Sequence, residues 1–263
     1  MDLGLNGRVA LVCGSSSGLG LAIATTLAEE GCRVALNGRN ETRLEPALKQ
    51  VRGVATDTAA AFQADVSVPT EVERLVGRVT DDLGPIDILV CNAGGPPPTT
   101  FSDAPADSWQ EALELNLLST VNLCRAAVPG MRERKRGRVV CIASVAAKQP
   151  LGSLILSTTA RAGVLGFMKF LADEVAADGV TVNSVCPGYT RTGRVEELLD
   201  ELSAQRKLSR EEVERDVVRD IPAGRMGKPE ELAAVVTFLA SDRASYITGV
   251  ALQVDGGFIR SIV

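Results

Sequence analysis

A strand-like apolar run leads directly into a glycine-rich turn near the amino terminus, and this junction limits the fold more than any other feature. The run 8–13 is followed by Gly14, Gly18 and Gly20, and a segment with helical apolar spacing comes next. Glycine accepts the backbone angles of a tight turn and lets a ligand or a strand come close. A helix that begins there turns its free N–H groups toward a phosphate. The junction therefore predicts a dinucleotide site within a βαβ unit, and the alternative is a plain tight turn.

Strand-length apolar runs alternate with helical patterns along the whole chain. The expected strands cover 8–13, 33–37, 60–64, 86–91, 138–143, 180–185 and 250–254, and the expected helices lie near 18–30, 41–52, 69–83, 108–134, 155–177 and 229–240. The strands lack polar alternation, so both faces of their sheet are expected to be covered. We therefore predict an α/β fold with one domain over 1–263, built on a doubly wound, Rossmann-type parallel sheet with helices on both faces.

Composition narrows the function classes. The net charge of −5 gives no bulk attraction for nucleic acid or an anionic membrane, and 3% aromatic residues offer few platforms for stacking bases. The first seven residues lack a basic region, and we expect no apolar run of membrane-spanning length. These observations favour a cytoplasmic protein with a small-molecule substrate. The six cysteines show no C-x-x-C pair and are expected to be small buried hydrophobes.

The chain contains no histidine, which limits its chemistry sharply. Nucleophiles activated by histidine and metal sites built on histidine are excluded. Any acid–base catalysis has to come from Tyr, Lys, Asp, Glu, Cys or a hydroxyl group. No metal ion is expected.

The segment 194–220 is heavily charged, yet part of it keeps helical apolar spacing. The spaced residues are Val195, Leu198, Leu199 and Leu202. We interpret the wider segment 190–224 as an insertion that covers a substrate as a mobile lid. The alternative is a solvated surface helix with one packed face.

Short motifs follow one another in an order that resembles one family. They are the glycine turn, Asp65-Val66, Asn92-Ala93-Gly94, Asn116, Ser144, Pro187-Gly188 and Thr192. Their order and spacing resemble the short-chain dehydrogenase/reductase family in its compact single-domain form. The resemblance runs from Leu5 to Gly257 and implies a seven-stranded sheet of order 3-2-1-4-5-6-7.

The resemblance also implies where a nicotinamide coenzyme would lie. Asp65 would accept a hydrogen bond from the adenine amino group, Asn92 would border the ribose, and Thr192 would help to hold the nicotinamide amide. Alternatively, Asp65 only caps a turn and Asn92 only ties strands together. The expected coenzyme-binding residues are Gly14, Ser16, Ser17, Gly18, Leu19, Gly20, Arg39, Asp65, Val66, Asn92, Ala93, Gly94, Pro187, Gly188 and Thr192.

The end of the second expected strand indicates which coenzyme is preferred. Gly38 stands where NAD-selective relatives carry an acidic residue that binds the ribose 2′-hydroxyl and repels a 2′-phosphate. Arg39 follows, and its guanidinium suits a phosphate. We therefore predict NADP(H) as the preferred coenzyme, with NAD(H) as the alternative and an ordinary surface charge as the other interpretation of Arg39.

The catalytic positions depart from the family pattern. Reductases of the family use an Asn, a Ser and a Tyr-x-x-x-Lys pair, and Asn116 and Ser144 match the first two. Where the Tyr and Lys are due, this chain has Ser157 and Arg161. A serine hydroxyl is far less acidic than a phenol of pKa about 10, and arginine does not release its proton. Two interpretations follow: activity is lost, or the site is rebuilt for a different, for example anionic, substrate.

Several groups could replace the missing phenol. Tyr189 follows Pro187-Gly188 near the nicotinamide end, but a pocket wall is the simpler role for it. Tyr246 is expected to be structural and Lys148 to be a solvated loop residue. The remaining candidate is a water molecule held by Ser144, Ser157 and Arg161. We hypothesise that Ser144 orients the substrate and that protonation is mediated by water.

Three function classes remain. The main hypothesis is an NADP(H)-dependent oxidoreductase of 3-oxoacyl reductase type, which acts on a carbonyl or an alcohol with an atypical proton donor. The second is a non-catalytic dinucleotide-binding protein that serves as a sensor or a partner subunit. The third is non-redox chemistry in the same cleft, such as a dehydration.

The resemblance further implies a homotetramer or a dimer. Family members pair two helices that correspond to 108–134 and 155–177. The candidate contact residues are Met131, Leu165, Phe167, Met168 and Leu171, some of which are expected to belong to the core.

Overall fold

The computed structural model describes residues 1–262 and contains one parallel sheet with seven strands in that range. The strands are β1 (Val9–Val12), β2 (Arg33–Gly38), β3 (Ala59–Gln63), β4 (Ile88–Cys91), β5 (Gly137–Ile142), β6 (Val180–Pro187) and β7 (Ala251–Val254). Their order is β3-β2-β1-β4-β5-β6-β7, and every neighbouring pair is parallel. The predicted fold class and strand order are therefore confirmed.

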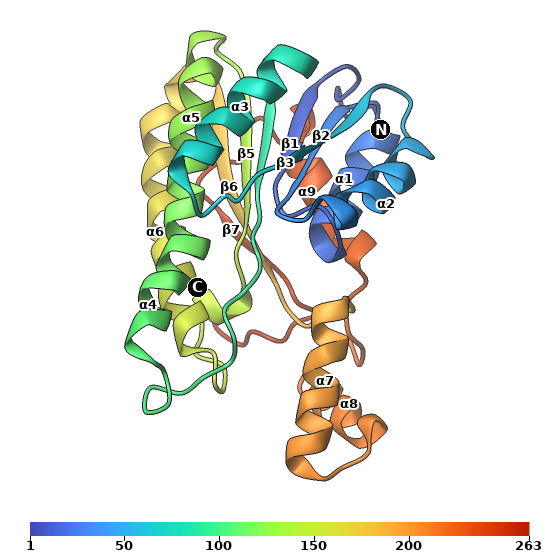
Figure 1. The fold of residues 1–263 in the computed structure, drawn as a ribbon, viewed down its shortest axis with the longest axis vertical. Coiled ribbons are helices and arrows are strands. Elements are labelled where there is room, and N and C mark those ends of the chain that lie inside the picture. Colours follow the sequence, from blue (N-terminus) through green and yellow to red (C-terminus); the bar gives the residue numbers. More distant parts are fainter. Residues whose placement is uncertain (263) are drawn as a thin grey trace.

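Helices cover both faces of the sheet (Figure 1). They are α1 (Gly18–Glu29), α2 (Glu41–Arg52), α3 (Pro69–Leu83), α4 (Ala106–Leu113), α5 (Ser119–Glu133), α6 (Ile155–Val175), α7 (Gly193–Arg206), α8 (Arg210–Arg219) and α9 (Pro229–Ala240). One hydrophobic cluster joins the sheet to α3, α5 and α6, and a second joins it to α1, α2 and α9. Because both faces are covered, all residues of β1, β4 and β5 are buried, which explains why their sequences lack polar alternation.

The segment predicted as one helix over 108–134 is divided in three. Helix α4 ends at Leu113, a π-helical turn covers Glu114–Leu118, and α5 begins at Ser119. A π turn inserts an extra residue into the helical register and is frequent at functional sites. Here the turn carries Asn116, which is buried and whose amide donates to the Gly94 carbonyl over 2.8 Å.

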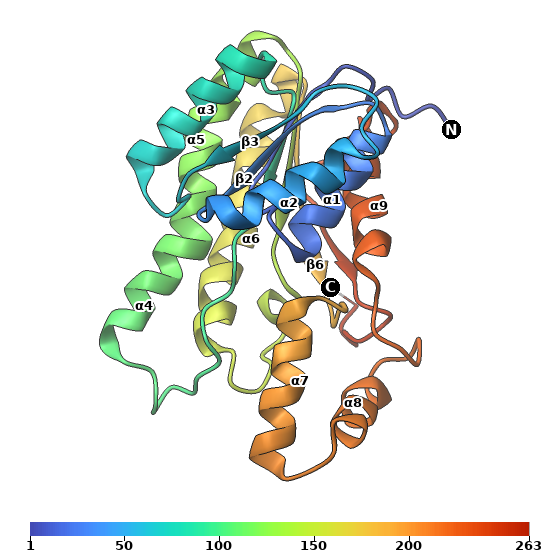
Figure 2. The same cartoon turned by 45° about the vertical axis from the view of Figure 1, so that its right-hand side comes forward.

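Helices α7 and α8 form an arm that extends away from the sheet (Figures 1 and 2). The sequence predicted one amphipathic insertion here, and the structure shows two helices. Leu199 and Val213 are buried between them. Arg191 pairs with Glu196 and with Glu214, so ion pairs connect the two helices at the base of the arm.

Two residues proposed for a subunit contact belong to the core instead. Met131 is fully buried, and Met168 is 2% exposed. Leu165, Phe167 and Leu171 are half-buried and pack against core clusters. The expectation that some of the five candidates belong to the core is therefore confirmed for the two methionines.

The same helices carry apolar side chains that the sequence analysis did not select. Phe170 on α6 is 81% exposed and Leu118 in the π turn is 45% exposed. Among the described residues one segment, Ile155–Asp178, is apolar and long enough to cross a membrane, contrary to the expectation of no such run. Its buried face packs on the sheet through Val164 and Ala172, as the core helix of a folded domain does.

Candidate active site

A cleft of about 910 Å³ lies along the carboxyl ends of the strands. In a doubly wound sheet, ligands bind at this edge, where the strand order reverses between β1 and β4. All fifteen residues that the sequence predicts for coenzyme binding line this cleft. Three of the four predicted catalytic residues, Ser144, Ser157 and Arg161, line it as well. The individual roles of these residues stay predictions.

The glycine turn has the backbone that close packing of strand and helix requires. Gly14 has φ +57°, in the left-handed region that favours glycine. A Cβ at Gly20 would lie 2.2 Å from the Gly14 carbonyl oxygen, so only glycine fits there. Ser17, the residue before α1, makes no side-chain hydrogen bond to the first turn of that helix. The first turn of α1 therefore has no side-chain cap from Ser17, and Gly18, Leu19 and Gly20 of this turn line the cleft.

The end of the cleft beside β2 and β3, where the adenosine is predicted to bind, combines a cation and a carboxylate. The guanidinium of Arg39 lies 3.7 Å from the carboxylate of Asp65, and Asp65 also accepts hydrogen bonds from the backbone N–H and the hydroxyl of Ser67. Asp65 thus caps the turn before α3 while it lines the cleft. A Cβ at Gly38 would lie 3.3 Å from Cδ2 of Leu44 and 3.4 Å from Cβ of Ser16, which is close to ordinary van der Waals contact.

Two further polar residues line this end that sequence reasoning missed. They are Thr42 and Arg43, in the first turn of α2. The side chain of Asn40 caps this helix by accepting from the Thr42 backbone N–H. The signal was readable, because Arg43 follows Arg39 by four residues and lies in the first turn of the helix that comes after β2.

Asn92 ties the centre of the sheet together. Its amide donates to the carbonyl oxygens of Cys13 and Gly14, both over 3.1 Å. These two hydrogen bonds join the end of β4 to the end of β1 beside the glycine turn. The alternative that Asn92 holds strands together therefore agrees with the structure, and Asn92 also lines the cleft.

The opposite end of the cleft contains a linked serine and arginine on α6. Nη1 of Arg161 donates to Oγ of Ser157 over 2.6 Å, across one helical turn. Ser144 follows β5, and its Oγ accepts from the Ala146 backbone N–H over 3.0 Å, which fixes the start of a short helical turn. The Ser144 hydroxyl hydrogen is therefore free to donate to a ligand.

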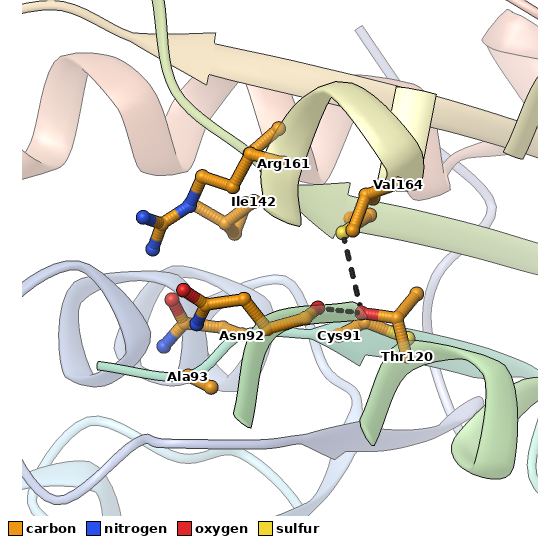
Figure 3. A pocket seen from close by; sticks show the side chains of 10 residues that line it. Cys91, Asn92, Ala93, Thr120, Ile142, Arg161 and Val164 are labelled. Atoms are coloured by element: carbon orange, nitrogen blue, oxygen red, sulfur yellow. Dashed lines mark hydrogen bonds between the residues drawn. The ribbon is translucent and has the colours of Figure 1, made fainter. Parts of the chain in front are cut away.

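A second, small cavity of about 10 Å³ lies behind Arg161. Figure 3 shows Arg161 extending from α6 past Ile142, with its guanidinium turned toward Asn92 and Ala93. Asn116 lines this small cavity together with Arg161 and does not line the main cleft, so it lies apart from Ser144 and Ser157 but beside Arg161. Its buried Oδ1 has no hydrogen-bond partner within the described part of the chain. The cavity has about the size of one water molecule.

The groups proposed as replacement proton donors differ in position. Tyr189 lines the cleft, and its ring packs edge-on against Phe258 at 5.6 Å. Burial raises the pKa of the Tyr189 hydroxyl, which makes it a weaker acid. Tyr246 is fully exposed, and Lys148 does not line the cleft.

The cysteines are buried free thiols, as predicted. Burial raises the pKa of Cys141, in β5, to about 12. A thiol of this pKa stays protonated near neutral pH, so it supplies neither a base nor a nucleophile.

Comparison with known proteins identifies the family. The family model described as enoyl-(acyl carrier protein) reductase matches residues 14–259. The 3-oxoacyl-[acyl-carrier-protein] reductase FabG of Vibrio cholerae is 38% identical over 255 residues, which cover 97% of this chain and 98% of that protein. The chain belongs to the short-chain dehydrogenase/reductase family. It is thus a member of a family of NAD(P)-dependent oxidoreductases.

Solved structures of this family share the whole fold with the chain. L-Sorbose reductase from Gluconobacter frateurii, complexed with NADPH and L-sorbose, has a TM-score of 0.95 and 36% identity, and the match covers 100% of both chains. A variant of actinorhodin polyketide ketoreductase, solved with NADPH, has a TM-score of 0.92 and 35% identity over 97% of this chain and 98% of that one.

Proposed function

We propose that this chain is an NADP(H)-dependent oxidoreductase of 3-oxoacyl reductase type that interconverts a carbonyl and an alcohol with an atypical proton donor. One observation carries the proposal: a single cleft joins the glycine turn to Ser144, Ser157 and Arg161. A coenzyme gripped at the turn would extend along the strand ends toward those three side chains.

The preference for NADP(H) is supported at the adenosine end. A 2′-phosphate needs cations and no acid at the end of the second strand, and Arg39 and Arg43 both line the cleft there. Gly38, at the end of β2, supplies no acid. The two similar reductases described above were solved with NADPH.

We infer that Ser157 and Arg161 stand at the positions of the family's Tyr and Lys. The support is their spacing from Ser144 along the sequence and their place in the cleft. Arg161 retains the positive charge of the lysine, but its hydrogen bond is directed at Ser157. A serine hydroxyl is too weak an acid to take over the role of a phenol.

A bound nicotinamide coenzyme would supply the hydride for the substrate carbon. The chain's part is to hold the carbonyl oxygen and to bring it a proton. The Ser144 hydroxyl donates to that oxygen, and a water held by Ser144, Ser157 and Arg161 transfers the proton. The hydroxide left behind is reprotonated from solvent through the open cleft. The small cavity behind Arg161, with the unpartnered Oδ1 of Asn116, offers room for one water beside this path.

We propose that residues 190–224 act as a lid over the substrate. Thr192, Val195 and Leu198 line the cleft from the base of α7. The ion pairs that connect α7 to α8 would let the arm move as one body. We also keep the predictions of a cytoplasmic location and of a homotetramer or dimer, the latter supported by the exposed Phe170 and Leu118.

A second candidate is a dinucleotide-binding protein without catalysis. The observation that favours it is that the Ser157 hydroxyl is engaged by Arg161, while no tyrosine other than Tyr189 lines the cleft. Such a protein would bind NADPH and turn nothing over.

Two measurements test the proposal. Calorimetry with NADPH and NADH measures binding, and NADPH oxidation with a broad panel of carbonyl compounds measures turnover. Tight NADPH binding with turnover above the buffer rate supports the oxidoreductase, whereas binding without turnover supports the second candidate. The double variant Ser157→Tyr/Arg161→Lys is a control: carbonyl reduction gained there means that the rest of the cleft is competent.

A further inference from the structure

We propose that Arg161 binds a carboxylate of the substrate, so that the alcohol or carbonyl compound is a hydroxy or oxo acid. The inference rests on the proposed oxidoreductase function and names its substrate class. It comes from the charge, the donors and the surroundings of Arg161.

The charge of Arg161 has no partner of opposite sign. Among residues 1–262, no carboxylate lies within ion-pair distance of its guanidinium. By contrast, Arg39 and Arg194, which also line the cleft, face Asp65 and Glu197. Burial lowers the pKa of Arg161, and the groups that raise it are only the thiols of Cys141 and Cys186. A half-buried cation without a counterion is costly, and an anionic ligand would remove that cost.

The donors of Arg161 are also mostly unused. Of its five N–H groups, one on Nη1 reaches the Ser157 hydroxyl. A Cβ at Gly95 would lie 3.5 Å from Nη1 and 3.9 Å from Nη2, so this part of the cleft wall is bare glycine backbone. A carboxylate accepts two parallel hydrogen bonds from a guanidinium, and this planar geometry fits the open fork.

Arg161 and Ser144 line the same cleft. Ser144 is the residue proposed to hold the reacting carbonyl oxygen. A carboxylate on Arg161 and a carbonyl on Ser144 therefore belong to one molecule that lies within this cleft.

Arg161 has one competing role, which is to bind the ribose hydroxyls of the coenzyme. Those hydroxyls are neutral and would leave the positive charge uncompensated. In the carboxylate role, loss of Arg161 weakens the binding of acids. In the ribose role, it weakens the binding of NADPH, so an experiment can separate the two.

The test compares ligands that differ only in charge. Butyrate and butyramide are titrated by calorimetry into the protein with and without NADPH. Initial rates are measured with 2-oxobutyrate and 3-oxobutyrate against their methyl esters. The variants are Arg161→Gln, which removes the charge, and Arg161→Lys, which keeps it. Lys169→Gln is the matched control, because it removes one positive charge from the exposed side of the same helix.

We expect butyrate to bind at least ten-fold more tightly than butyramide, and the acids to be preferred to their esters. Arg161→Gln should abolish both differences, Arg161→Lys should keep part of them, and Lys169→Gln should keep them fully. Circular dichroism shows whether Arg161→Gln folds. If it does not fold, the comparison of acids with esters on the unchanged protein and on Arg161→Lys still tests the inference.

Equal binding of butyrate and butyramide, or equal turnover of acids and esters, would overturn the inference while leaving the oxidoreductase function standing. A loss of NADPH affinity in Arg161→Gln with carboxylate binding unchanged would also overturn it, in favour of the ribose role. Butyrate binding that depends on Arg161, without turnover of any carbonyl compound, would support the anion site and refute the oxidoreductase function.

Discussion

Replacement of Gly20 by alanine tests the central claim that the glycine turn is built for a dinucleotide. The new Cβ would lie 2.2 Å from the Gly14 carbonyl oxygen and 2.9 Å from Nδ2 of Asn92. Favourable contacts between heavy atoms lie at about 3.5 Å, so the turn or the helix has to move by more than about 1 Å. Overpacking of this kind costs about 1–3 kcal/mol, which lowers the melting temperature of a domain of this size by roughly 2–12 °C.

The same movement displaces the N-terminus of α1 from the phosphates of a bound coenzyme. We expect the dissociation constant for NADPH to rise by about 10- to 100-fold, which corresponds to about 1.4–2.7 kcal/mol. Circular dichroism melting and calorimetric titration measure the two effects.

The matched control is Gly77→Ala, in the middle of helix α3. Gly77 is exposed, and a Cβ there meets nothing within 4 Å. This change should stabilise the fold by up to about 1 kcal/mol and leave NADPH binding unaltered. The reasoning is refuted if Gly20→Ala behaves like Gly77→Ala in both measurements.

Three further predictions concern coenzyme choice, acid stability and assembly. Arg39→Gln should weaken NADPH binding by about 10-fold and leave NADH binding within about two-fold, measured by fluorescence titration, since one charge-assisted contact to a 2′-phosphate is lost; an unchanged ratio would contradict the NADP(H) assignment. The guanidinium of Arg225 holds the pKa of Glu231 at about 2, below its ordinary 4.5, so its stabilising effect is complete above pH 4.5 and is lost as the pH falls through about 2. In urea unfolding, the free energy of unfolding of Glu231→Gln should fall less between pH 4.5 and about 2 than that of the unchanged protein. An equal fall in both proteins would count against the Arg225–Glu231 pairing. Light scattering should give the mass of a tetramer or dimer for the unchanged protein and a lower mass for Phe170→Glu. A monomeric mass for the unchanged protein would refute the proposed interface.

The positions of the strands were predictable because the strands are short, and all residues of β1, β4 and β5 are buried. The run 33–37 became Arg33–Gly38, and 180–185 became Val180–Pro187, so the strand ends moved by two residues or fewer. The π turn at Asn116 was not predictable, because a long-range hydrogen bond to Gly94 accompanies it. The break between α7 and α8 did leave a local signal. Ser209 and Glu212 form a capping box, a pattern that marks the start of a helix in sequence alone.

The coenzyme half of the cleft was easier to predict than the catalytic half. Glycine positions are fixed by backbone geometry, and the clash at Gly20 follows from local spacing that a sequence motif records. The link between Arg161 and Ser157 depends on a side-chain rotamer and on burial, which a sequence does not record. The separation of Asn116 from the main cleft likewise depends on how α6 packs against the π turn.

The two halves of the cleft would bind their ligands in different ways under the proposed function, and this difference would let one half change while the other persists. At the turn the proposed contacts come from backbone N–H groups, and the turn itself needs Gly14 and Gly20. At the other end the proposed contacts come from side chains, two of them on α6. Ser157 and Arg161 are one helical turn apart and share a hydrogen bond, so a change at either residue alters the surroundings of the other. If Ser157 and Arg161 stand at the positions of the family's Tyr and Lys, as we propose, this hydrogen bond couples them, and the two changes are then one replacement of a phenol by a fixed positive group.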